Sequence, residues 1–291
     1  MVARQTFRAG LFAAPLLAVL AAAVVLPAGY NALLAFWRYD ALADTWRFAG
    51  AANFRRLAEA PAFWNAVGVT AIWVGGNVLL QLTLGLAVAL ALNTVTRLRA
   101  FYSAMVMVPW VSSFVVVAIV FLWLYHPELG VVNDTLVRLG LIDRPITWLA
   151  TPELAQLSLV LANTWKFFPI VAITLFSGLQ SVSTELVEAA AVDGAGRLAL
   201  LARVVLPLLA PSIATAVLLA AIWAFNAFTL PIIMTSGGPL GATEVIGLYI
   251  YKLAFDAFDF GLAAAASLLL FLVILAATLA YLRVADPGGR R

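Results

Sequence analysis

The stretch that decides the fold is residues 66–92, AVGVTAIWVGGNVLLQLTLGLAVALAL, within a charge-free interval between Glu59 and Arg97. About 20 mainly apolar residues are enough for a helix to cross the hydrocarbon core of a bilayer, which is about 30 Å thick. Backbone polar groups in lipid must be hydrogen-bonded internally, which a single helix achieves and an open strand does not. These residues are therefore predicted to form a transmembrane helix.

The same reasoning, applied to the other intervals between charged residues, predicts six transmembrane helices. The expected spans are about 11–37, 66–92, 101–125, 154–178, 209–230 and 260–282. Residues 11–26 resemble the core of a signal peptide, but no small-x-small cleavage site follows them, so we expect a retained first helix. The predicted fold class is all-α, a polytopic membrane protein in which residues 1–291 form one transmembrane domain.

The composition agrees with a chain whose main solvent is lipid. Hydrophobic residues make up 65% of the 291 residues and charged residues 11%, against roughly 45–50% and about 25% in a typical globular protein. So few charges cannot cover a water-soluble surface of this size. We expect membrane lipid as a partner and, because the net charge is only +3, no nucleic acid.

The rarity of reactive side chains excludes several kinds of site. The chain has no cysteine and a single histidine, His126. Disulfides, thiolate nucleophiles and cysteine-ligated zinc are therefore excluded. One histidine cannot supply a His-Glu-x-x-His motif. We expect no metal site and no catalytic residue, which argues against an enzyme that acts within the membrane.

The loop charges predict an orientation. With six spans both termini lie on one side, and that side collects nine basic and four acidic residues, against seven basic and ten acidic on the other. Because cytoplasmic loops carry the excess of Arg and Lys, we expect both termini in the cytoplasm. The nine basic residues are Arg4, Arg8, Arg97, Arg99, Arg197, Arg203, Arg283, Arg290 and Arg291.

The loop between the fourth and fifth spans, residues 183–207, reads STELVEAAAVDGAGRLALLARVVLP. Residues 184–192 are predicted to form a short helix that Ser183 caps. Asp193-Gly194 is a turn signal, since glycine admits the left-handed backbone that ends a helix. A second amphipathic segment, residues 197–206, leads to Pro207. On its geometry alone, this helix-turn-helix is most simply an ordinary interhelical connection.

The residues of this loop resemble the EAA motif of ABC importer permeases, in the form found in the carbohydrate-uptake branch that includes the maltose and glycerol-3-phosphate permeases. Ser183 and Leu201 depart from the family pattern, where a proline and an aromatic residue are common. The residues that carry the resemblance are Glu188, Ala189, Ala190, Asp193, Gly194 and Ala195, followed by Leu206 and Pro207. Further matches in family order are Phe48, Asn53, Val108-Pro109-Trp110, Asn163-Thr164-Trp165, Pro169 and residues 235–239.

This resemblance implies a fold, a set of partners and a location. The fold is the type I ABC importer transmembrane domain, in a bacterial or archaeal cytoplasmic membrane. The eight loop residues would dock on a cytoplasmic ABC ATPase dimer, beside a second homologous permease and an extracytoplasmic solute-binding protein. The chain lacks a Gly-x-x-x-x-Gly-Lys-Ser/Thr motif. We therefore expect it to bind no cofactor, with ATP and Mg on the partner ATPase.

Lys166 is the most unusual residue within the predicted spans. A charge in the bilayer is costly unless it is paired or hydrated, and Lys166 follows Glu153 by about 20 Å of helix. It marks either a functional site or a side chain that reaches toward the interface. Two pairs on shared helical faces, Asn77 with Gln81 and Asn226 with Thr229, either line a site or hold helices together.

The resemblance favours a solute site at mid-membrane. In the family, such a site draws on the fourth-span Asn-Thr-Trp segment and the fifth-span Phe-Asn segment. Amides hydrogen-bond sugar hydroxyls and aromatic faces stack on sugar rings. The residues implied are Asn163, Lys166, Phe167, Phe225 and Asn226, with Trp110 as a weaker candidate.

The function predicted from the sequence is the permease subunit of an ATP-driven, binding-protein-dependent importer of a sugar or sugar-like solute. The alternative is a secondary transporter driven by an ion gradient. That class uses intramembrane carboxylates, and no Asp or Glu lies within the six spans. Glycerol phosphate, a disaccharide, a longer oligosaccharide and a polyol all remain open as the solute.

Overall fold

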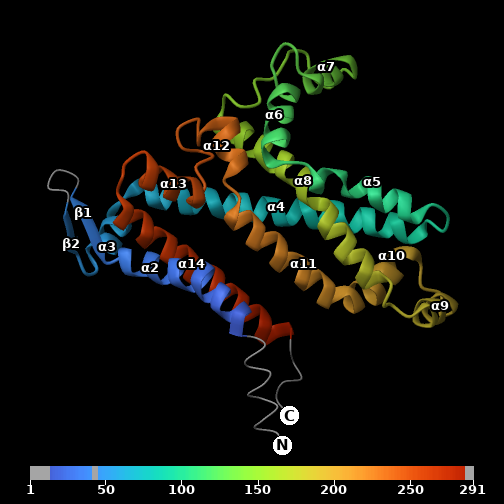
Figure 1. Ribbon diagram of the computed structural model, residues 1–291. Coiled ribbons are helices and arrows are strands. Elements are labelled where there is room, and N and C mark those ends of the chain that lie inside the picture. Colours follow the sequence, from blue (N-terminus) through green and yellow to red (C-terminus); the bar gives the residue numbers. More distant parts are fainter. Residues whose placement is uncertain (1–13, 41–44, 286–291) are drawn as a thin grey trace, which may run out of the picture. The chain divides into compact units, whose positions relative to one another are not determined.

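The computed structural model describes residues 14–40 and 45–285 (Figure 1). Residues 11–13 of the predicted first span, together with Arg4, Arg8, Asp286, Arg290 and Arg291, lie outside the described residues. The chain divides into two compact units, residues 1–63 with 250–273 and residues 64–249 with 274–291. Each unit is described separately.

The first unit contains a membrane helix, a hairpin and a short helix. Its elements are η1 (Ala21–Val25), α2 (Leu26–Leu34), β1 (Trp37–Asp40), β2 (Thr45–Phe48), α3 (Ala52–Glu59) and the start of α14 (Phe260–Ala285). The first membrane helix ends at Leu34 instead of extending to residue 37, because the next residues form the hairpin. Trp37 pairs with Phe48 and Tyr39 with Trp46 across the strands, the aromatic pairing that stabilises such ribbons.

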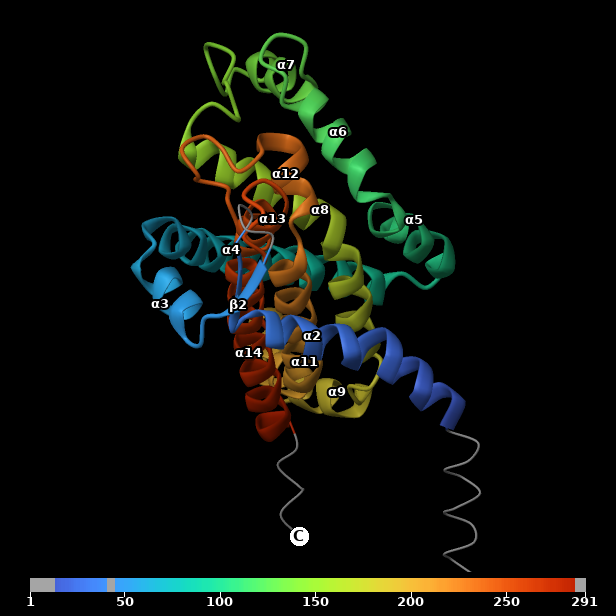
Figure 2. The same ribbon diagram turned by 60° about the vertical axis from the view of Figure 1, so that its left-hand side comes forward.

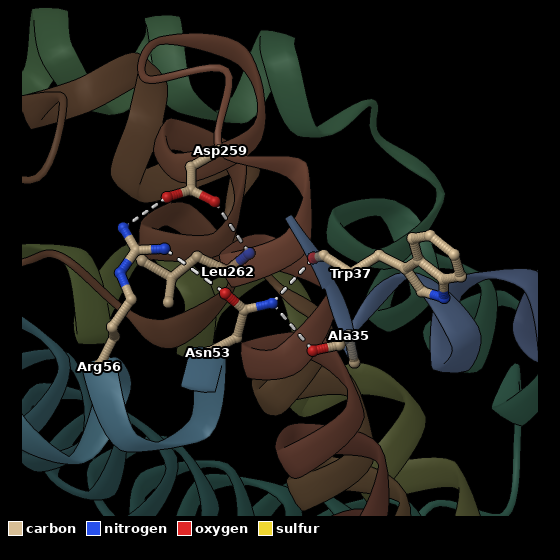
Figure 3. A network of polar contacts seen from close by, with 6 residues as sticks. All are labelled: Ala35, Trp37, Asn53, Arg56, Asp259 and Leu262. Carbon is tan, nitrogen blue, oxygen red and sulfur yellow. Dashed lines mark hydrogen bonds and ion pairs between the residues drawn. The ribbon is translucent and has the colours of Figure 1, made fainter. Parts of the chain in front are cut away.

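A polar network around Asn53 joins three segments of this unit (Figure 3). Asn53 is fully buried, and its amide donates to the carbonyl oxygens of Ala35 at 3.0 Å and Trp37 at 2.9 Å. The guanidinium of Arg56 contacts the carboxylate of Asp259 at 2.7 Å. Asp259 in turn accepts a bond from the backbone N–H of Leu262 in the first turn of α14. Arg56 also donates to the side-chain oxygen of Asn53 at 3.4 Å, so the network links the start of α14 to the hairpin and α3.

The second unit is built almost entirely from helices (Figures 1 and 2). Its elements are α4 (Pro61–Thr94), α5 (Arg99–Val111), α6 (Phe114–Leu124), α7 (Val131–Arg138), α8 (Pro152–Leu179), α9 (Thr184–Val192), α10 (Arg197–Leu200), η2 (Leu201–Val205), α11 (Leu206–Asn226), α12 (Thr229–Thr235), α13 (Ile246–Phe255) and the end of α14. Helices α4, α13 and α14 contribute residues to both units. Among the described residues, five helices are long and apolar enough to cross a membrane, or six if α5 and α6 form one bent span.

Helix α8 lies at the centre of the second unit, where it packs against α5, α6, α11 and α12. Small residues permit close approach of its neighbours: a Cβ at Gly85 of α4 would come within 2.7 Å of the Val171 side chain. Between lipid-embedded helices such tight packing replaces the hydrophobic driving force that operates in water. The buried cluster formed by α4, α8 and α11 comprises Ala89, Val171, Leu175, Leu179, Leu209, Ala216 and Ala220.

The third predicted span, residues 101–125, is not one straight helix. Helices α5 and α6 meet at an angle of 89°, and the bend between them is visible in Figure 1. Ser112 and Ser113 at the junction both adopt extended backbone, with ψ of 142°. Adjacent serines compete with helical hydrogen bonds and are a frequent cause of sharp kinks.

The fifth predicted span also differs, because its helix ends at Asn226 instead of residue 230. Ala227 is extended, and a new helix begins at Thr229. Pro231 accounts for the interruption. In a continuous helix its ring would clash with the carbonyl of Ala227, whereas in the first turn of a new helix its missing N–H is harmless.

We predict that Gly85→Val destabilises the protein while Gly75→Val has little effect. Both glycines lie in α4, but a Cβ at Gly75 meets no atom within 4 Å. Overpacking at Gly85 should cost about 1–3 kcal/mol. Thermal unfolding of the detergent-solubilised protein measures the difference, and equal midpoints for the two variants would contradict this packing.

We also predict that Asn53→Leu lowers the unfolding temperature more than Asn65→Leu does. Asn53→Leu leaves two carbonyl oxygens without a donor, at about 1–3 kcal/mol for each buried group. Asn65 makes a single exposed bond to the Gly241 carbonyl. A midpoint for Asn53→Leu no lower than that for Asn65→Leu would show that the network does not stabilise the fold.

Candidate functional site

A cavity of about 390 Å³ lies in the second unit where the two helix interruptions occur. It is called the Lys166 cavity below. Helices α5, α6, α8, α11 and α12 each contribute to it, together with Ala227 between the last two. Its lining residues are Trp110, Phe114, Lys166, Phe167, Trp223, Asn226, Ala227 and Thr229.

Lys166 holds the break between α5 and α6. Its ammonium donates to the carbonyl oxygens of Trp110 at 3.1 Å and Ser112 at 2.6 Å. The last carbonyls of a helix have no intrahelical donor, so the lysine satisfies groups that the break leaves unpaired. The ammonium also lies 4.4 Å from the ring centroid of Phe114 and 5.7 Å from that of Phe167, distances typical of cation–π contacts.

Three aromatic rings form a connected row along the cavity. Phe114 and Phe167 have ring centroids 5.6 Å apart, and Phe167 and Trp223 are 5.3 Å apart. Both pairs are tilted, within the usual range of aromatic contacts. The row gives the cavity an apolar, flat-faced wall.

The polar part of the cavity comes from the interruption between α11 and α12. The Asn226 amide donates one bond to the Ile222 carbonyl at 2.8 Å, and the residue is exposed. Asn226 and Thr229 were expected to share a face of one helix. They belong to two helices, yet both line the cavity because the chain turns between them.

Asn163 and Phe225 lie outside the residues that line this cavity. Asn163 is fully buried, and its amide donates to the side-chain oxygen of Asn77 at 2.6 Å. Gln81 donates to the same oxygen at 3.1 Å. This arrangement is the interhelical hydrogen bonding that was the alternative interpretation of these residues, and it joins α4 to α8.

Sequence reasoning did not single out Phe114 or Trp223. Trp223 lies three residues before Asn226, a spacing that places both on one side of a helix, and this signal was available. Phe114 enters the cavity because the chain bends at Ser113, which hydropathy does not reveal.

The loop with the EAA-like residues forms a projecting pair of helices, called the knob below (residues 183–206). The helix predicted at 184–192 is α9, with those bounds. Gly194 has φ of +86°, so the expected left-handed turn is confirmed. Ser183 takes an extended N-cap conformation, but its side chain makes no capping bond with the described residues. Segment 197–206 continues through η2 directly into α11, which carries Pro207 in its first turn.

The knob exposes the residues that the resemblance singles out. Glu188, Ala189, Asp193 and Gly194 are exposed, and Ala190 and Ala195 are half-buried. Glu188 also lines a second cavity, of about 350 Å³, next to α9. Its other lining residues are Leu90, Asn93, Leu179, Gln180, Val182, Thr184, Val187 and Val205.

Comparisons with known proteins identify the family. Residues 81–287 match the family described as binding-protein-dependent transport system inner membrane component. The sulfoquinovosyl glycerol transport system permease protein SmoG of Agrobacterium fabrum is 34% identical over 220 residues, 76% of this chain and 70% of that protein. The trehalose/maltose transport system permease protein MalF of Thermococcus litoralis is 35% identical over 208 residues, 72% of this chain and 70% of that protein.

A solved structure agrees with these matches. The chain resembles one chain of the bacterial alginate ABC transporter in complex with alginate pentasaccharide-bound periplasmic protein, with a TM-score of 0.78 and 25% identity over 96% of this chain and 94% of that one. Nothing in these matches favours the ion-gradient alternative. The chain belongs to the binding-protein-dependent inner-membrane permeases: it is a transport subunit of an ABC importer, and a separate ATPase subunit hydrolyses the ATP.

Proposed function

We propose that this permease imports a sugar or sugar-like solute and that the Lys166 cavity contacts the solute on its path. The observation that carries the proposal is the pairing of an aromatic row with an amide and a hydroxyl in one cavity. Sugar rings have apolar C–H faces that pack on aromatic rings. Their hydroxyls need both donors and acceptors, which Asn226 and Thr229 supply.

The relatives support a carbohydrate-like solute without deciding which one. The names of the two permeases specify sulfoquinovosyl glycerol and trehalose or maltose, and the solved transporter was captured with an alginate pentasaccharide on its periplasmic protein. The row Phe114–Phe167–Trp223 suits any of these, since each contains sugar rings with C–H groups that can pack on an aromatic face.

The proposed assembly contains this chain, a second homologous permease, an ABC ATPase dimer and an extracytoplasmic solute-binding protein. ATP and Mg²⁺ bind to the ATPase, because this sequence has no phosphate-binding loop. Both termini and the knob lie on the cytoplasmic side in this arrangement. The exposed Ala189 and the half-buried Ala190 leave a smooth docking face, and Leu206 and Pro207 connect that face to α11.

We predict that Ala190→Trp and Gly194→Val each weaken association with the ATPase. Tryptophan at Ala190 would collide with the partner, since protein interfaces pack about as densely as protein interiors. At Gly194 a Cβ meets no atom within 4 Å, so the effect comes from backbone strain at φ of +86°. That strain costs of order 1–3 kcal/mol.

Gly196→Val is the matched control for Gly194→Val. Gly196 has the same open surroundings but a φ of −67° that valine adopts without strain. Copurification of the ATPase with the permease and solute-stimulated ATP hydrolysis provide the two measurements. Normal association for both Ala190→Trp and Gly194→Val would show that the knob is not the docking element.

We predict that Asn226→Leu lowers solute uptake by roughly tenfold or more, as expected for the loss of a hydrogen-bonding group from a solute site. Thr83→Leu is the control, because Thr83 likewise bonds the carbonyl four residues before it but lies outside the cavity. Uptake into vesicles that contain the complete importer measures the effect. Equal uptake by the two variants would assign Asn226 to helix packing.

A further inference from the structure

Lys166 carries a positive charge that no described carboxylate balances. The side chain is 3% exposed. Within residues 14–40 and 45–285, its polar partners are the carbonyl oxygens of Trp110 and Ser112, and no ion pair includes it. A lysine ammonium has three N–H donors, so one has no hydrogen-bond acceptor among the described residues.

The two carbonyl groups hold the ammonium without neutralising it. They belong to the C-terminal end of α5, where the helix dipole is equivalent to roughly half a negative charge. The rings of Phe114 and Phe167 add cation–π attraction. Each of these contacts attracts the ammonium and fixes its position, but a buried cation without an anionic partner remains costly.

The rest of the cavity contains nothing that could serve as that partner. The other lining residues are aromatic, amide, hydroxyl or methyl side chains, and none is acidic. Capping the end of α5 needs donors but not a net charge, and a neutral amide supplies donors as well. The helix end and the rings therefore attract the charge but leave it without a counter-ion among the described residues.

We propose that the imported solute carries an anionic group, a carboxylate, sulfonate or phosphate, and that Lys166 binds this group with its free donor. The inference rests on the proposed function, since it names the class of sugar that the same cavity accepts. A charge-assisted hydrogen bond to such a group is roughly twice as strong as a neutral one. An anion would complete the ammonium's contacts while the sugar ring packs on the aromatic row.

The first test uses the complete importer in proteoliposomes with matched neutral and anionic probes. The pairs are glucose with glucuronate, galactotriose with trigalacturonate, and glycerol with glycerol 3-phosphate. We expect uptake of an anionic member and not of its neutral partner. Uptake of a neutral member in preference to its anionic partner would overturn the inference and leave the proposed sugar import intact. Uptake of no probe in the panel would count against the proposed function itself.

The second test changes the charge at Lys166. For the transported anionic probe, Lys166→Gln should reduce uptake by about tenfold or more, as expected when a hydrogen bond to a charged group is lost. Lys166→Arg, which keeps the charge, should retain most of the uptake. Uptake by Lys166→Gln as strong as that by Lys166→Arg would assign the lysine to capping α5 alone.

A third pair of variants separates charge from folding, because Lys166→Gln also alters the α5–α6 break. Thr229→Asp places a carboxylate in the cavity without changing Lys166 or the two residues whose carbonyls it binds. Thr229→Asn is its neutral match, and both residues are accepted in the first turn of a helix. We expect uptake of the anionic probe to be about tenfold lower for the aspartate variant than for the asparagine variant. Equal uptake would overturn the inference.

Discussion

The contact between the Lys166 ammonium and the carbonyl groups that end α5 determines much of the structure around it. In the hydrocarbon region no water is present to bind a carbonyl that has lost its helical partner, so a break needs a donor from the protein. Lys166 supplies that donor at 2.6 Å from the Ser112 oxygen. A similar device operates at the other interruption, where the indole N–H of Trp73 donates to the carbonyl of Ala224 near the end of α11. The cavity lies where the two breaks occur. Residues on both sides of each break line it. A polar site is therefore present inside an apolar bundle where helices are interrupted, although few of the side chains are polar.

Hydropathy and glycine chemistry were sufficient to predict the parts of the fold that depend on local sequence. The long apolar helices follow from the spacing of charges, and the bounds of α9 follow from a run of good helix formers that ends at Asp193-Gly194. The break at Ser112–Ser113 was not predictable in the same way, because two neutral serines scarcely change the mean hydropathy of an apolar segment. The hairpin that follows the first membrane helix was missed for a related reason: Trp37 can end a span as well as begin a strand, and only its pairing with Phe48 shows that it belongs to a strand.

Which neighbour a polar side chain contacts depends on how the surrounding helices pack. It cannot be predicted from the local sequence. Asn163 and Lys166 are less than one turn apart in α8, yet Asn163 contacts Asn77 of α4 while Lys166 lines the cavity. The sequence alone placed both in one solute site, since both are polar residues deep in the same span. Their separation follows from packing, because α8 is covered by α4 on one side and by α5 and α6 on another. Central helices of this kind can carry a structural polar contact and a functional one on adjacent faces.

The position of α8 and α11 also explains how the knob and the cavity could act together. The knob connects these two helices, and both carry cavity residues far from the knob. Lys166, for example, lies 13 positions before the end of α8, about 20 Å along the helix axis. Segment 197–226 is helical without a gap, so a displacement of the knob can pass along it toward the cavity. Near the knob, Gly178 of α8 lies against Ser212 of α11 so closely that a Cβ would overlap that side chain. This contact packs the two helices closely together next to the knob. A displacement of α9 that α8 and α11 follow would shift Phe167 and Trp223 relative to Phe114 of α6, and this shift would change the aromatic wall of the cavity.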